Sequence, residues 1–131
     1  MKLRIQGNSL RIRIGRSEFE RLLSQGRIED SIQFTPASDA SFTYALEVSD
    51  SGDPLTQVRY SPCQVAVTLT RKQVELWSQE GEVGIRAQIP IGNGNSLEVL
   101  VEKDFACLDR GEEGNEDTFA NPRAGKSCQV A

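Results

Sequence analysis

The stretch Leu10-Arg11-Ile12-Arg13-Ile14 decides the fold, together with Val65-Ala66-Val67-Thr68-Leu69, which lies 55 positions further along. Both place a branched aliphatic residue at every second position, and this spacing predicts a strand with one face against a core. The apolar pattern around them matches at the same offset, so that residues 2–48 repeat, without a gap, as residues 57–103. Few aligned residues are identical, and the apolar spacing carries the match. We therefore interpret the chain as two copies of one unit.

Each copy is predicted to consist of two strands, a short helix and two further strands. The expected strands are Lys2–Gln6, Ser9–Ile14, Arg27–Phe34 and Phe42–Val48 in the first copy, and Gln57–Ser61, Gln64–Leu69, Glu82–Ile89 and Leu97–Lys103 in the second. Ser17 with Glu20, and Thr70 with Gln73, have the spacing of a helix capping box. Trp77, on the second helix, is expected to fill the core.

Six to eight strands with one apolar face tend to curl and close, because closure removes exposed edges. We therefore expect a single α+β domain over residues 1–131, built on a mainly antiparallel, strongly curved or closed sheet of six to eight strands. Two short helices and a pseudo-twofold axis between the copies complete it. Residues 104–131 lie outside the repeat and are predicted to form an irregular acidic tail.

Composition favours a soluble domain. The chain is 37 % hydrophobic and 26 % charged, which is ordinary for a globular protein. No apolar run approaches the roughly 20 residues of a membrane span, and the N-terminus does not read as a signal peptide. Three cysteines without an export signal favour a reducing compartment, so we expect a cytoplasmic protein without membrane contact.

Absent residue types narrow the function. The chain has no histidine, which removes the commonest general base and most catalytic zinc sites. No glycine motif that cradles phosphate precedes a helix. The net charge of −4 disfavours nucleic-acid binding. We therefore expect no enzymatic activity and no cofactor, and the leading interpretation is a module that binds a partner protein or itself.

The polar face of the strands is the strongest candidate binding site. Strand alternation points basic and acidic side chains away from the apolar face: Lys2, Arg4, Arg11, Arg13, Arg59 and Arg86, with Glu47, Glu98 and Glu102. Turned inward in a wide barrel, this face would form a tunnel for phosphates, because the arginine fork suits phosphate oxygens and carboxylates can hold a divalent cation. Turned outward, the commoner case in small barrels, it is a solvated surface. The alternative interpretation is therefore a binder of phosphate-rich small anions.

Two resemblances bear on these interpretations. Leu-Arg-Ile-Arg-Ile at residues 10–14, inside duplicated units, resembles the strands of triphosphate-tunnel (CYTH-like) barrels, which implies a closed barrel with a phosphate ligand. Those families begin with a Glu-x-Glu-x-Lys strand, whereas Lys2–Gln6 lacks the metal-binding acids, and no site residue is transferred. Residues 1–13 and 99–108 resemble a family of small uncharacterised bacterial proteins. That resemblance implies a bacterial cytoplasmic protein and no particular activity.

The tail contains a weaker candidate site. Cys107, Asp109 and Cys128 are residue types that bind zinc, but the cysteines are far apart and no Cys-x-x-Cys pair occurs. The two cysteines could also pair on oxidation. The alternative is that the tail has no binding site and is a solvated acidic segment with unpaired thiols.

Overall fold

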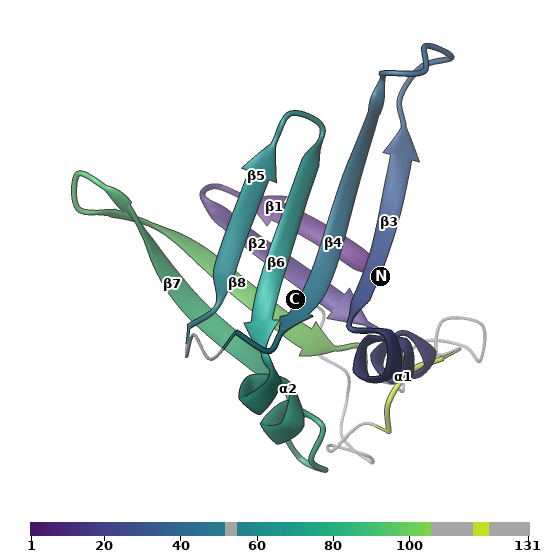
Figure 1. Ribbon diagram of the computed structural model, residues 1–131, viewed down its shortest axis with the longest axis vertical. Coiled ribbons are helices and arrows are strands. Elements are labelled where there is room, and N and C mark those ends of the chain that lie inside the picture. The colour runs from purple at the N-terminus through teal and green to yellow at the C-terminus, as the bar shows by residue number, and fades with distance from the viewer. Residues whose placement is uncertain (52–54, 106–116, 121–131) are drawn as a thin grey trace.

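The computed structural model describes residues 1–51, 55–105 and 117–120 (Figure 1). The elements follow the predicted order, strand–strand–helix–strand–strand, twice. They are β1 (Lys2–Gln6), β2 (Ser9–Ile14), α1 (Arg16–Gln25), β3 (Arg27–Gln33), β4 (Ser41–Ser49), β5 (Gln57–Ser61), β6 (Gln64–Thr70), α2 (Arg71–Trp77), β7 (Gly84–Gly92) and β8 (Asn95–Lys103). Cys107, Asp109 and Cys128 lie outside the described residues, so the predicted metal site in the tail is not tested.

The strands form two four-stranded sheets rather than one closed sheet. Sheet A has the order β1-β2-β8-β7, and sheet B has the order β3-β4-β6-β5. In each sheet the two outer pairs are antiparallel and the central pair, β2–β8 or β4–β6, is parallel. The expected closed barrel and the expected single sheet of six to eight strands are therefore wrong. Most of the pairings are antiparallel, as expected, but each sheet has a parallel pair at its centre. Stacking two apolar faces buries them as well as closure does, and strand alternation is the same in both arrangements.

The helices carry the chain from one sheet to the other. The hairpin β1–β2 precedes α1 and belongs to sheet A, whereas the hairpin β3–β4 follows α1 and belongs to sheet B. The second half does the reverse, from sheet B through α2 to sheet A. Each sheet is thus assembled from one hairpin of each half.

The central pairs of the two sheets have the same register. Ile12 is opposite Val101 in sheet A, and Leu46 is opposite Val67 in sheet B. Moving each residue by 55 positions converts one pair into the other.

The edge strand β7 departs from the gapless alignment. Ile28 is opposite Leu46 in sheet B, and the same offset would place Val83 opposite Val101 in sheet A. Ile85 takes that position instead, two residues further on. A shift by an even number of residues keeps the same side chains on the same face, so the apolar pattern could not detect it.

The core lies between the sheets and is closed at one end by both helices (Figure 1). Phe19 and Leu22 of α1, and Val74 and Trp77 of α2, are buried there. The rings of Phe19 and Trp77 meet edge to face, with centroids 4.6 Å apart. Such aromatic pairs contribute about 0.5–1.5 kcal/mol beyond the area they bury. Trp77 is therefore a core residue, as predicted.

The two helix starts differ from each other. Thr70 and Gln73 form the predicted capping box of α2, in which the backbone N–H of Gln73 donates to Thr70 Oγ1 at 3.1 Å. The box predicted at Ser17 and Glu20 is wrong. Helix α1 begins two residues earlier, and Glu18 accepts a hydrogen bond of 3.0 Å from the backbone N–H of Gly15.

Candidate functional site

Three rows of side chains cross the outer face of sheet A, and strand register defines them. The row nearest the helices contains Lys2, Arg13, Glu102 and Gly84. The middle row contains Arg4, Arg11, Leu100 and Arg86. The distal row contains Gln6, Ser9, Glu98 and Gln88. All three rows face away from the core, as alternation with Ile12 and Val101 requires.

Glu102 neutralises the row nearest the helices. Its Oε1 accepts hydrogen bonds from Arg11 Nε at 2.6 Å and from Arg13 Nε at 2.5 Å. Glu102 is 8 % exposed, so these contacts are shielded from solvent. Lys2 is paired with Asp104, with Nζ 2.8 Å from Oδ2. Little unbalanced charge remains in this row.

The middle row has positive charge that the protein does not neutralise. Arg4 and Arg86 are exposed on the edge strands, and within the described part of the chain neither has a hydrogen bond or ion pair. Arg11 lies between them and shares Glu102 with Arg13. Three strand spacings separate Arg4 from Arg86, which is about 14 Å between backbones. Both long side chains can therefore reach one ligand lying over Leu100.

The distal row is made of amides, a hydroxyl and one carboxylate. Gln88 Nε2 donates to Glu98 Oε1 at 3.3 Å. Ser9 Oγ donates to the carbonyl oxygen of Gln6 at 2.6 Å. These side chains offer neutral donors and acceptors beside the arginines.

Two adjoining cavities lie on this face. The first, of about 260 Å³, lies over the middle and distal rows and is lined by Arg4, Gln6, Ser9, Leu10, Arg11, Arg86, Ala87, Gln88, Glu98, Val99 and Leu100. The second, of about 560 Å³, is lined by Gln6, Asn8, Ser9, Ile91, Gly94, Asn95, Ser96 and Glu98. They share Gln6, Ser9 and Glu98, and we call them together the sheet A groove.

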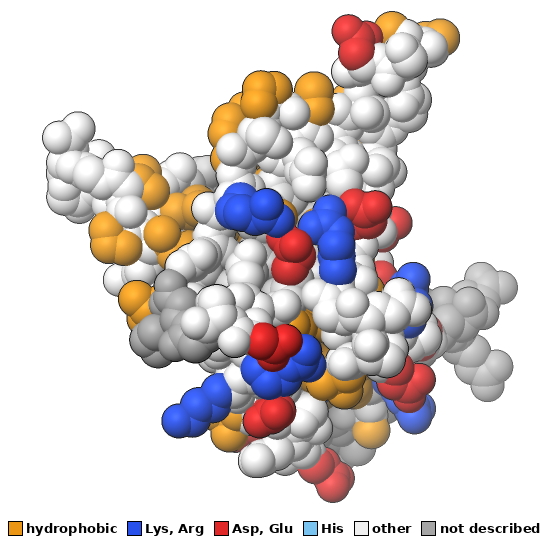
Figure 2. Space-filling model, in the orientation of Figure 1, with side chains coloured by type: hydrophobic (Ala, Val, Ile, Leu, Met, Phe, Trp, Pro, Cys, Tyr) orange, Lys and Arg blue, Asp and Glu red, His pale blue; other side chains and the backbone are white. Residues whose placement is uncertain are grey.

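The outer face of sheet B has a different charge pattern. Its counterpart of the middle row contains Arg59, Ala66, Ala45 and Glu29. Arg59 is hydrogen-bonded to Glu47, whose other oxygen lies 3.0 Å from Arg27. Partial burial acts to raise the pKa of Glu47, but the hydrogen bonds and charges of Arg59 and Arg27 outweigh it and hold that pKa below its usual value. Figure 2 shows basic and acidic side chains side by side on the visible face of the molecule.

The nine predicted site residues are thus divided between two surfaces. Sheet A carries Lys2, Arg4, Arg11, Arg13, Arg86, Glu98 and Glu102, whereas sheet B carries Arg59 and Glu47. The expectation of one shared face is wrong because the two hairpins of each half enter different sheets. The sequence analysis also did not include the neutral side chains of the distal row, Gln6, Ser9 and Gln88, among the site residues. Alternation alone could have added Gln6 and Ser9, but the parallel pairing that brings Glu98 beside Ser9 had no local signal.

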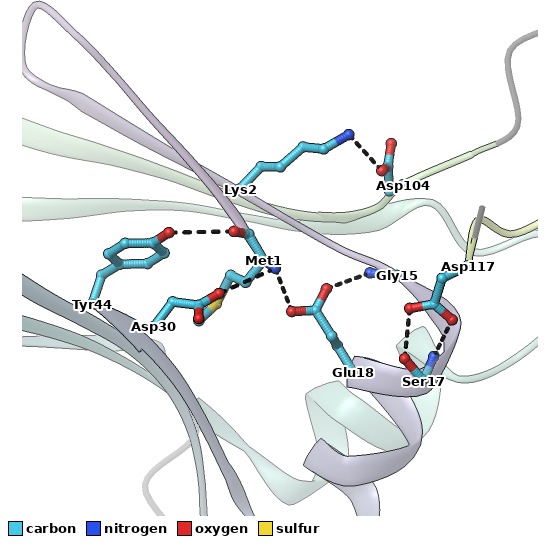
Figure 3. A network of polar contacts seen from close by, with 9 residues as sticks. All are labelled: Met1, Lys2, Gly15, Ser17, Glu18, Asp30, Tyr44, Asp104 and Asp117. Atoms are coloured by element: carbon cyan, nitrogen blue, oxygen red, sulfur yellow. Dashed lines mark hydrogen bonds and ion pairs between the residues drawn. The ribbon is translucent and has the colours of Figure 1, made fainter. Parts of the chain in front are cut away.

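A second polar network lies where the N-terminus meets α1 (Figure 3). The Met1 ammonium is paired with Glu18 and lies 3.4 Å from Asp30 Oδ2. Tyr44 donates a hydrogen bond of 3.3 Å to the Met1 carbonyl oxygen. Burial raises the pKa of Tyr44, and the charges of Asp30 and Glu18 add to this shift. The side chain of Asp30 is half-exposed beside the Met1 ammonium group.

Two further properties bear on function. Among residues 1–51, 55–105 and 117–120, no group of three or more Cys, Asp or Glu side chains is placed to hold a metal ion. In the same ranges neither helix is long and apolar enough to cross a membrane.

Comparison with known proteins identifies a family. Residues 1–123 match the family described as Family of unknown function (DUF7009). No curated protein and no solved structure matches the chain. The resemblance to a small uncharacterised family is therefore confirmed, whereas the resemblance to triphosphate-tunnel barrels is not supported. The chain belongs to DUF7009, a family of unknown function.

Proposed function

We propose that this protein is a non-enzymatic binding module that holds a small phosphate-bearing anion in the sheet A groove. The proposal combines two expectations from the sequence, a binding module and a phosphate ligand on the arginine-bearing strands. It replaces the tunnel of a closed barrel with an open groove on one sheet.

The comparison of the two middle rows carries the proposal. Sheet A has Arg4, Arg11 and Arg86 where sheet B has Arg59, Ala66 and Glu29. In sheet B, Arg59 is paired with Glu47 of the neighbouring row, whereas among the described residues Arg4 and Arg86 of sheet A have no such partner. The guanidinium groups of Arg4 and Arg86 therefore have free hydrogen-bond donors, which a bound anion would engage.

The chemistry of the arginines favours phosphate. Guanidinium groups present paired N–H donors that match the oxygens of phosphate, and such charge-assisted hydrogen bonds are among the strongest in proteins. Arg4 and Arg86 approach from opposite edges of the sheet and Arg11 from between them. An anion with several oxygens can engage all three, whereas a single carboxylate has only two oxygens to share.

The layout of the two halves supports duplication followed by divergence. The central pairs Ile12–Val101 and Leu46–Val67 occupy equivalent places in the two sheets. We infer that the halves arose from one duplicated unit and that sheet A alone acquired the row of three arginines. The lack of histidine in the chain supports binding without catalysis.

A ligand titration tests the proposal. Inorganic triphosphate bound to the folded state should raise the melting temperature and give a saturable calorimetric signal. Each of Arg4→Ala and Arg86→Ala should weaken binding about ten- to hundredfold, the range expected for a lost hydrogen bond to a charged group. The affinity should fall as salt rises, because exposed charges are screened.

Arg59→Ala is the matched control. Arg59 occupies the place in sheet B that Arg4 occupies in sheet A, so this change removes the same charge from the same register position. Triphosphate affinity should not change in this variant. Equal losses in Arg4→Ala and Arg59→Ala would show that only net charge matters, and the proposal would then be wrong. Binding of a partner protein or self-association stays a prediction, which sedimentation of the purified protein tests.

A further inference from the structure

The sheet A groove has two chemically different sides. On three of its four strands an arginine is followed or preceded, two residues away, by a neutral polar side chain on the same face. These pairs are Arg4 with Gln6, Arg11 with Ser9, and Arg86 with Gln88. Residues two apart on a strand are separated by about 6.7 Å along it. A row of cations therefore runs parallel to a row of neutral hydrogen-bonding groups, at a spacing larger than one phosphate group.

Glu98 makes the distal row unsuitable for a second phosphate. It lies on β8 beside Ser9, and the cavity over the arginines includes it. Its Oε1 accepts a hydrogen bond from Gln88, and in the described ranges its Oε2 has no partner. An ionised carboxylate only accepts hydrogen bonds, so it repels phosphate oxygens and favours hydroxyl groups.

The neighbouring cavity continues this neutral character. Beyond the shared residues it is lined by Asn8, Asn95 and Ser96, with Ile91 and Gly94. Asn8 Nδ2 donates to the Ser96 carbonyl oxygen at 2.8 Å, and this bond joins the turn between β1 and β2 to the start of β8. Amide and hydroxyl groups fixed in this way can bind neutral hydroxyls as donors and acceptors.

The volume also exceeds what a simple anion requires. Pockets for small molecules usually have volumes of about 300–1,000 Å³. Of the two adjoining cavities, the larger, of about 560 Å³, lies in that range, and the smaller, of about 260 Å³, lies just below it. A bare phosphate group would occupy the arginine side and leave the larger cavity unused.

We propose that the ligand is a phosphorylated sugar or a similar small polyhydroxylated phosphate ester. This inference rests on the proposed function. The phosphate lies against Arg4, Arg11 and Arg86. The hydroxyl-bearing body lies over the distal row, where Glu98 accepts hydrogen bonds from its hydroxyl groups. Leu100, in the middle row, lies under the junction of the two parts.

Calorimetric titration of the whole chain with matched probes tests this inference. The probes are a panel of hexose and pentose phosphates, the same sugars without phosphate, inorganic phosphate and inorganic triphosphate. At least one sugar phosphate should bind tenfold or more tightly than inorganic phosphate. The corresponding unphosphorylated sugar should bind more weakly than its phosphate ester.

The variant Glu98→Gln should separate the two sides of the groove. The variant should lower the affinity for the sugar phosphate about tenfold, because a charged hydrogen-bond acceptor is lost. It should leave triphosphate affinity unchanged or raise it, because a repelling carboxylate is removed. Glu98 is exposed and its replacement is isosteric, so the fold should persist, which circular dichroism checks. Glu75→Gln, an equal charge change on α2, is the control and should alter neither affinity.

The outcomes distinguish this inference from the proposed function. If triphosphate binds through the arginines but no sugar phosphate binds better than inorganic phosphate, the inference is wrong and the anion site remains. The inference is also wrong if Glu98→Gln changes the affinities for sugar phosphates and for triphosphate in the same direction. If neither triphosphate nor any sugar phosphate binds, both proposals fail.

Discussion

Asp117 caps helix α1 through Ser17, although 100 positions separate the two residues in the chain. Its Oδ1 accepts from the Ser17 backbone N–H at 2.9 Å, and its Oδ2 accepts from the Ser17 hydroxyl at 2.5 Å. The Arg16 backbone N–H donates to the Asp117 carbonyl oxygen at 2.8 Å. A distant segment thus supplies hydrogen-bond acceptors that Gly15, which has no side chain, cannot provide to the first turn of the helix.

Replacement of this cap should destabilise the protein. Asp117 has a φ of 55°, a left-handed conformation that asparagine tolerates, so Asp117→Asn keeps the backbone. The amide can accept from Ser17 with only one atom, and we expect a loss of about 1 kcal/mol in the free energy of unfolding, typical of a helix cap. Urea unfolding measures it. Glu20→Gln, an exposed change on the same helix, should have little effect. Equal stability of both variants would contradict the capping role.

The same contact predicts an acid dependence. The hydrogen bonds from the side chain and backbone of Ser17 lower the pKa of Asp117. A carboxyl with a lowered folded-state pKa contributes stability above its unfolded pKa and loses it as the pH falls through the folded value. The difference in unfolding free energy between the native protein and Asp117→Asn should therefore shrink below about pH 4, near the unfolded pKa of aspartate. A difference that stays constant to pH 2 would exclude this linkage.

Gly84→Ala should disturb the pairing of β7 with β8. An added Cβ would lie 2.4 Å from the Val101 carbonyl oxygen and 2.9 Å from Glu102 Cβ. Gly84 does not have a positive φ, so without this contact the change would stabilise the protein by about 0.4–1 kcal/mol. We expect instead a loss of about 1–3 kcal/mol, as for other overpacked sites. Thermal unfolding gives the sign directly, and a raised melting temperature would refute the clash. Gln88→Ala, on the exposed face of the same strand, should have a small effect.

Glu102→Gln should lower the stability of the protein and raise its affinity for triphosphate. Loss of the carboxylate weakens the hydrogen bonds from Arg11 and Arg13, and we expect the free energy of unfolding to fall by about 2 kcal/mol. Arg11 then becomes available to a ligand, so triphosphate affinity should rise. Glu47→Gln is the matched control, because Glu47 occupies the equivalent place in sheet B with Arg59 and Arg27 as partners. It should lower stability without changing triphosphate affinity. Weaker triphosphate binding in Glu102→Gln would contradict the arrangement.

Lys103→Met should stabilise the protein at neutral pH. Lys103 is 7 % exposed, its Nζ donates to the Gln79 carbonyl oxygen at 3.1 Å, and it lies 5.3 Å and 5.8 Å from the ring centres of Phe119 and Phe19. Burial lowers the pKa of Lys103, although the charges of Glu82 and Glu80 partly oppose it. Methionine keeps the apolar volume without the desolvated charge. We expect a melting temperature a few degrees higher in thermal scans.

The pH dependence provides an internal check on that variant. When burial lowers the folded-state pKa of a lysine, the unfolded chain binds the proton more tightly, so stability rises with pH between the folded and unfolded values. The native protein should therefore gain stability as the pH approaches 10.5, and Lys103→Met should lack this gain. Parallel pH profiles for the two proteins would show that Lys103 is not the group responsible.

Local patterns predicted much of the chain correctly. The order of the elements, the Thr70–Gln73 capping box and the burial of Trp77 depend on residues close together in sequence. The errors arose where a distant segment intervened. Helix α1 starts at a different residue because Asp117, beyond the repeat, holds Ser17. Strand β7 is shifted by two residues because the turns that flank it differ in length from those of the first half.

The candidate site shows the same division. Alternation predicted that Arg4, Arg11 and Arg86 face away from the core, and they do. It could not predict that Arg59 lies on the other sheet, or that Glu102 reaches Arg11 and Arg13, because those relationships depend on which hairpins meet.

The sequence by itself determined the strands, the helices and the polar and apolar face of each strand, because these follow from a periodicity that neighbouring residues impose on one another. Only the tertiary structure decided that the hairpins form two sheets, that β2 lies beside β8, and that one polar face has unneutralised arginines while the other has none in its equivalent row. Pairing between distant strands depends on how the helices redirect the chain and how whole surfaces fit together. No short stretch of residues contains that information.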